Sequence, residues 1–110
     1  MSNSRVYEIS ARDSAGVKLG ALVRVSSMDS ARARAMTLWP VDSGFRDQST
    51  SELQTFRFLE RAESAARALQ PRGFLAAEAE WDSGVECYVV RLNGNEGRHT
   101  YLPSSWGGYE

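Results

Sequence analysis

The sequence predicts an α+β fold in which two helices pack on one face of an antiparallel sheet, with the elements in the order ββααβββ. Three observations support this prediction. Residues near both ends of the chain alternate apolar and polar side chains, as strands do. The middle of the chain instead repeats apolar residues every three or four positions, as helices do. Turn-forming residues between the alternating segments favour hairpins at both ends.

Residues 5–13 and 17–26 form the first predicted hairpin. Tyr7 and Ile9 fall on one face of the first strand, and the second strand alternates in the same way. The turn between the strands is residues 13–16, Asp-Ser-Ala-Gly. An Asp side chain bonds its own backbone in such turns, and Gly adopts positive φ without strain. The segment therefore reads as two paired strands.

A short helix follows, and it is predicted to begin at Ser26 or Ser27 and to run through Leu38. Either serine suits the capping position, and Asp29 in the first turn suits the positive end of the helix dipole. Pro40 lies just past the predicted end. The helix is expected to bury an apolar stripe made of Met28, Ala31, Ala35 and Leu38.

Residues 40–51 lack a usable period and are rich in turn formers, so we predict a surface loop that carries Phe45. Ser49 and Glu52 then have the spacing of a capping box, which predicts that the longest helix begins there and runs to about Leu69. The expected apolar stripe of this helix consists of Leu53, Phe56, Leu59, Ala62, Ala66 and Leu69.

Three strands are predicted in the last third of the chain, at residues 74–81, 85–92 and 98–102. Turns are expected at 82–84 and in the Gly-rich segment 93–97. The first strand contains the run Leu-Ala-Ala-Glu-Ala-Glu, whose composition also favours a helix. The hairpin signal after that run is the reason for preferring a strand.

Length and composition limit the class of protein. A chain of 110 residues and 12.2 kDa predicts one domain spanning residues 1–110. No apolar run approaches the roughly 20 residues that span a bilayer, and no signal-peptide core follows the first residues, so a cytoplasmic protein is expected. Cys87 is the only cysteine and cannot form an internal disulfide, which fits a reducing compartment.

The sequence shows no recognisable catalytic, cofactor-binding or metal-binding motif. His99 and Cys87 are the only residues of their kinds, and the expected strand register keeps them apart, which argues against a Cys–His nucleophile pair. Gly94 and Gly97 lie in a predicted turn between strands, whereas phosphate-binding glycines precede a helix. We therefore expect a non-enzymatic protein with no cofactor.

Charge is distributed unevenly along the chain. Six basic and three acidic residues lie within 1–40, five of each within 41–75, and two basic against six acidic within 76–110, which sums to the net charge of −1. An acidic C-terminal third favours oriented docking to a charged partner, although pairing between the two ends of the chain explains the asymmetry equally well.

A protein is the predicted partner, and the residues expected to bind it are acidic or aromatic. The alternative needs no partner: the acidic residues lie on strand faces that are exposed to solvent, and Trp106 packs over the sheet edge or core. Trp and Tyr are common interface anchors, and carboxylates suit a basic surface. The predicted binding residues are Glu78, Glu80, Asp82, Glu86, Phe45, Trp106 and Tyr109.

Nucleic acid is not the favoured partner. Twelve of the thirteen basic residues are Arg, which suits phosphate or carboxylate recognition, but a high-GC genome produces the same bias. Arg24, Arg32 and Arg34 are the candidates for phosphate contact, and Arg32 and Arg34 point to different helix faces. With a net negative charge, the electrostatic footprint of a nucleic-acid-binding domain is weak.

Residues 7–36, from Tyr-Glu-Ile-Ser-Ala-Arg-Asp to Ala-Arg-Ala-Arg-Ala-Met, resemble the strand–strand–helix unit of small phage-encoded anti-CRISPR proteins. The resemblance is carried by the hairpin, the Ser/Asp-capped Ala-rich helix and the small size. It implies an inhibitor that blocks a CRISPR–Cas effector subunit, with the acidic C-terminal third mimicking phosphate or masking a basic subunit. Two alternatives are an immunity protein that neutralises a toxin and a small nucleic-acid-binding domain that uses the N-terminal arginines.

Overall fold

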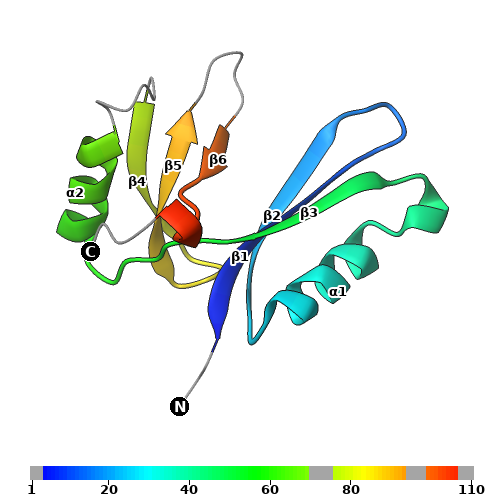
Figure 1. Ribbon diagram of the computed structural model, residues 1–110, viewed down its shortest axis with the longest axis horizontal. Helices are drawn as coiled ribbons and strands as arrows, with labels where there is room; N and C mark the ends of the chain where they lie inside the picture. The colour runs from blue at the N-terminus through cyan, green and yellow to red at the C-terminus, as the bar shows by residue number, and fades with distance from the viewer. Residues whose placement is uncertain (1–3, 70–75, 94–98, 107–110) are drawn as a thin grey trace. The chain divides into compact units, whose positions relative to one another are not determined.

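The computed structural model describes residues 4–69, 76–93 and 99–106 (Figure 1). The chain divides into two compact units, one ending at Glu52 and the other beginning at Leu53. Within the described residues, each unit contains one three-stranded antiparallel sheet and one α-helix of eleven residues.

The first unit has the sheet order β2-β1-β3, with α1 connecting β2 to β3. Asp13 closes the first hairpin, because its Oδ1 accepts hydrogen bonds from the N–H groups of Ala15 and Val17, both at 2.9 Å. Gly16 has a φ of 84°, which only glycine adopts readily. The predicted hairpin is therefore confirmed. The elements are β1 (Arg5–Arg12), β2 (Lys18–Val25), α1 (Met28–Leu38), the 3-10 turn η1 (Val41–Ser43) and β3 (Arg46–Glu52).

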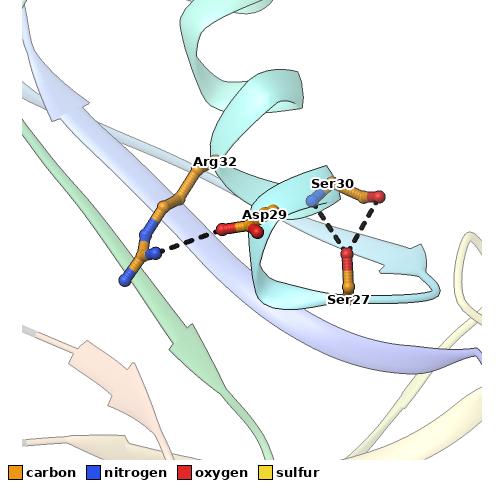
Figure 2. A network of polar contacts seen from close by, with 4 residues as sticks. All are labelled: Ser27, Asp29, Ser30 and Arg32. Carbon is orange, nitrogen blue, oxygen red and sulfur yellow. Dashed lines mark hydrogen bonds and ion pairs between the residues drawn. The ribbon is translucent and has the colours of Figure 1, made fainter.

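Local polar contacts mark the start of α1, as Figure 2 shows. The Oγ of Ser27 accepts a hydrogen bond from the N–H of Ser30 at 3.1 Å, so Ser27 rather than Ser26 is the cap. Asp29 and Arg32 form an ion pair one turn apart, with 3.4 Å between Oδ1 and Nη1. The predicted helix start is confirmed, and the alternative between the two serines is resolved.

The core of the first unit lies between α1 and one face of its sheet. Ala31 and Ala35 of α1 are buried there against Tyr7, Ile9 and Val23.

Leu38 is 48% exposed, so the prediction that it completes the buried stripe was wrong. Trp39 takes that place instead: its N–H donates to Ala35 O at 2.8 Å, and its side chain packs against the core.

Residues 46–52 form a strand, so the prediction of a surface loop over 40–51 was wrong there. The strand is polar and has no apolar period, and its position comes from pairing with β1, with Ile9 opposite Thr50 and Tyr7 opposite Glu52. Glu52 also forms an ion pair with Arg5 at 3.2 Å. The capping-box interpretation of Ser49 and Glu52 was therefore wrong, because backbone pairing to β1 uses both residues in a strand.

The second unit has the sheet order β4-β5-β6. Before its helix, the chain runs extended beside β5: Phe56 and Tyr88 exchange two backbone hydrogen bonds, each 2.9 Å long. The helix therefore begins at Leu59, well after the predicted cap at Ser49. The elements are α2 (Leu59–Leu69), β4 (Ala76–Asp82), β5 (Cys87–Asn93), β6 (His99–Tyr101) and the 3-10 turn η4 (Ser104–Trp106).

One face of the second sheet packs against α2. Strands β4 and β5 contribute Ala77, Val90 and Leu92 to this core, and Phe56 and Leu102 complete it. The helix contributes its buried residues, which are Ala62, Ala65, Ala66 and Leu69. The stripe predicted for this helix is thus correct from Ala62 onward, whereas Leu53 and Phe56 are buried from an extended segment and Leu59 is exposed.

The predicted α+β class with antiparallel pairing is confirmed. The predicted single sheet with two helices on one face was wrong, because β3 pairs with β1 and each sheet of the described chain has its own helix. Residues 76–82 are a strand, which resolves the choice between strand and helix in that segment. Most of the predicted Gly-rich turn at 93–97 lies outside the described residues, and one domain over 1–110 stays a prediction.

Candidate functional site

The β4–β5 hairpin carries four of the seven residues predicted to bind a partner. Its turn is held by Asp82, whose Oδ1 accepts hydrogen bonds from the N–H groups of Gly84 at 2.9 Å and Val85 at 3.0 Å. The carbonyl of Asp82 accepts a third bond, from Glu86 N–H at 2.8 Å. Asp82 therefore stabilises the turn and also contributes a negative charge to the hairpin. Glu86 lies in the left-handed region with a φ of 58°.

The two faces of the hairpin differ in chemistry. Successive residues of a strand point to opposite faces, so Glu78, Glu80 and Asp82 share one face of β4. Arg91 lies on the same face, directly opposite Glu78, and its Nη1 is 3.9 Å from an oxygen of Glu80. Opposite Glu80 and Asp82 this face also carries Val89 and Cys87, which are both buried, so its negative charge lies along β4. We call the three β4 carboxylates together with Arg91 the acidic face.

The opposite face of β4, which packs against α2, ends in an exposed aromatic residue. Trp81 is 52% exposed and lies opposite Tyr88, with ring centroids 5.0 Å apart and the planes at 65°. This edge-to-face contact holds the indole without burying it. Sequence reasoning did not select Trp81, although the alternation that placed Glu78 and Glu80 on one face also places Trp81 on the other.

The remaining predicted residues have different surroundings. Glu78 and Glu86 are exposed, and Glu80 and Asp82 are half-buried, so the hairpin groups these four acids. Phe45 is half-buried and belongs to the first unit. Trp106 lies in η4 and is 43% exposed, and Tyr109 lies outside the described residues.

A groove separates α2 from β4. It has a volume of about 340 Å³. The helix lines it with Leu59, Glu63 and Arg67, and the strand lines it with Ala77, Glu78 and Ala79. The two alanines of the strand are small and leave the groove unfilled, and its rim carries both signs of charge.

The separation of Cys87 and His99 can be read from the strand register. Cys87 is buried and forms no disulfide, and it lies opposite Asp82 at the turn end of β5. His99 pairs with Asn93, at the other end of the same strand, so Cys87 and His99 lie apart as the sequence predicts. Six residues of strand separate these positions by about 20 Å. In the part of the chain that the structure describes, no three His, Cys, Asp or Glu side chains gather as a metal site would require.

No helix among the described residues has the length and apolar character needed to cross a membrane. Comparison of the chain with protein-family models, curated proteins and solved structures found no match.

Proposed function

We propose that this chain is a non-enzymatic binding protein that inhibits a partner protein by covering a basic surface of that partner with the β4–β5 hairpin. The observation that carries the proposal is the exposed Trp81 on a strand whose neighbouring positions are acidic. An aromatic side chain supplies contact area at an interface, and surrounding carboxylates supply orientation and rate of association.

The charge of the hairpin favours a protein partner over nucleic acid. Glu78, Glu80, Asp82 and Glu86 lie on the hairpin, and Arg91 is the basic residue that its two strands carry. Phosphate groups would be repelled by this surface, and nucleic-acid affinity depends on basic contacts.

A CRISPR–Cas effector is the first partner to test. The resemblance of residues 7–36 to anti-CRISPR proteins suggests it, and charge complementarity supports it, because such effectors hold their nucleic acids in positively charged channels. The acidic hairpin would compete for such a channel.

A plasmid-interference assay tests this partner. Expressing the chain in strains with active CRISPR–Cas systems of different types should raise transformation by a targeted plasmid at least tenfold in one of them. Trp81→Ala should remove most of that gain, because truncating an interface tryptophan commonly costs tenfold or more in affinity. Asp42→Asn, an exposed change in the first unit, is the matched control and should leave the gain intact. Unchanged transformation in every strain would exclude this partner.

Site-specific photo-crosslinking tests the binding surface whatever the partner is. A benzophenone amino acid replaces Trp81 in one variant and Met36, which is exposed on α1, in another. In the organism that encodes the chain, position 81 should give a discrete crosslinked product and position 36 should not. The double variant Glu78→Gln/Glu80→Gln should weaken that product. Equal products at both positions would contradict a binding surface on the hairpin.

A further inference from the structure

We propose that the outer edge of β4 binds an extended segment of the partner protein as an added strand, with basic side chains over the acidic face and apolar side chains in the groove beside α2. This inference rests on the proposed function and specifies the kind of segment that the hairpin recognises. Strand addition to a sheet edge is a common mode of peptide recognition, in which backbone bonds give affinity and alternate side chains give specificity.

The direction of the peptide groups of β4 follows from the bonds of β5. Tyr88 exchanges backbone hydrogen bonds with Phe56, and Val90 O accepts one from Leu102, so the peptide groups of Tyr88 and Val90 point away from β4. Peptide groups alternate sides along an antiparallel strand. The β5 residues whose peptide groups point toward β4 are therefore Cys87, Val89 and Arg91, opposite Asp82, Glu80 and Glu78.

It follows that the N–H and C=O groups of Ala77, Ala79 and Trp81 point outward from the sheet. Strand β4 is the first in the order β4-β5-β6, and no described strand pairs with its outer edge. Unpaired backbone groups on an edge strand are a template for a further strand. These three residues also place their side chains on the face that packs against α2.

The groove supplies space for the side chains of an added strand. Figure 1 shows α2 beside β4, and the helix packs on the sheet face that also carries Val90 and Leu92 of β5. Ala77 and Ala79 line the groove without filling it, and Leu59 gives it an apolar wall from the helix. A strand paired to Ala79 would direct the side chain opposite Ala79 into this groove.

Charge selects the occupant. A second copy of the chain, pairing β4 with β4 about Ala79, would place Glu78 directly opposite Glu80 of the other copy, and like charges in that position are destabilising. A segment with Lys or Arg at the same positions would be attracted instead. The structure thus favours a partner segment that alternates apolar residues, opposite Ala77, Ala79 and Trp81, with basic residues opposite Glu78 and Glu80.

A defined peptide tests this geometry. The probe is a capped octapeptide of alternating Lys and Val, titrated into the full chain and followed by amide NMR. Saturable shifts are expected at Ala77, Ala79 and Trp81. A peptide of the same composition with four Lys followed by four Val should bind at least tenfold more weakly. Equal binding of the two peptides would mean charge attraction alone and would overturn the proposal, as would the absence of saturable binding.

Backbone methylation separates strand addition from other modes of binding. In the proposed register, the Val residues exchange hydrogen bonds with β4 and the Lys amides point away from it. N-methylation of two Val residues should therefore reduce affinity at least tenfold, whereas N-methylation of two Lys residues should retain it. Equal loss or equal retention in the two peptides would overturn the register and the proposal.

A variant of the chain provides the reciprocal test. Ala79→Pro removes an outward N–H but leaves the ladder bonds of Glu78 and Glu80, and proline is accepted on an edge strand in that orientation. This variant should bind the alternating peptide at least tenfold more weakly than the wild-type chain, and its circular dichroism spectrum should be unchanged. If this variant unfolds, the methylated peptides decide the question. A concentration-dependent dimer of the wild-type chain that Ala79→Pro abolishes would instead assign the edge to a second copy.

The outcomes for the peptide and for inhibition are separable. If the alternating peptide fails to bind while Trp81→Ala still removes inhibition, strand addition is wrong and the proposed function stands.

Discussion

The two units place an eleven-residue helix against a three-stranded sheet in different ways, as far as the described residues show. Helix α1 buries Ala31 and Ala35, and its start is fixed by the Ser27 cap (Figure 2). Helix α2 buries Ala62, Ala65, Ala66 and Leu69, and it follows an extended segment that is bonded to β5. One helix is specified largely by local contacts and the other largely by burial, which is the usual source of helix stability in proteins.

The largest effect is expected where α2 is most buried. Leu69 is fully buried, and Leu69→Ala should lower the free energy of unfolding by about 2–5 kcal/mol through lost apolar contact and a cavity. Urea denaturation followed by circular dichroism measures the change. Leu38→Ala, at an exposed position of α1, is the matched control and should change stability by less than about 0.5 kcal/mol. Similar losses in both variants would contradict the difference between the helices.

The cap of α1 should have the next largest effect. Ser27→Ala removes the acceptor of the Ser30 N–H and should cost about 1 kcal/mol in thermal or urea unfolding. Ser26→Ala removes a similar hydroxyl one residue earlier, where the structure shows an exposed residue before the cap, and should be nearly neutral. If Ser26→Ala costs more than Ser27→Ala, the assignment of the cap is wrong.

Each unit also contains a non-glycine residue with positive φ. Glu86 at 58° lies in the second unit and Asp47 at 55° in the first. Glycine relieves the strain of this conformation, and Asp tolerates it better than Glu does. Glu86→Gly should therefore raise the free energy of unfolding, measured by urea denaturation, by up to about 1 kcal/mol, and Asp47→Gly should raise it less. A larger gain from Asp47→Gly would contradict this ranking.

The smallest effects are expected for the surface ion pairs. Arg5 and Glu52 lie 3.2 Å apart in the first unit, and Arg91 and Glu80 lie 3.9 Å apart in the second. Glu52→Gln and Glu80→Gln should each cost about 0.2–1 kcal/mol, and less in high salt. Urea denaturation in low and high salt measures both. A cost above 2 kcal/mol for Glu80→Gln would mean that this residue supports the fold and would make it unsuitable for binding tests.

The candidate site was predicted in part. Alternation along residues 78–82 was enough to place Glu78 and Glu80 on one face of a strand, because side chains alternate in any strand. Trp81 was not selected, because the alternation that places it on the face toward α2 does not show whether the helix covers it. The groove beside β4 has no signal in the sequence, because Leu59 and Ala79 are brought together only by packing.

The sequence by itself determined the first hairpin through the local signals of Asp13 and Gly16, and it placed the start of α1 at Ser26 or Ser27 and a turn at residues 82–84. The structure then selected Ser27 as the cap and a strand over residues 76–82. Only the tertiary structure decided the conformation of residues 46–58. That segment contains a polar strand and an extended stretch because β1 and β5 supply backbone hydrogen-bond partners for it. Pairing through the backbone does not require a particular side-chain pattern, so the sequence of the segment does not reveal it.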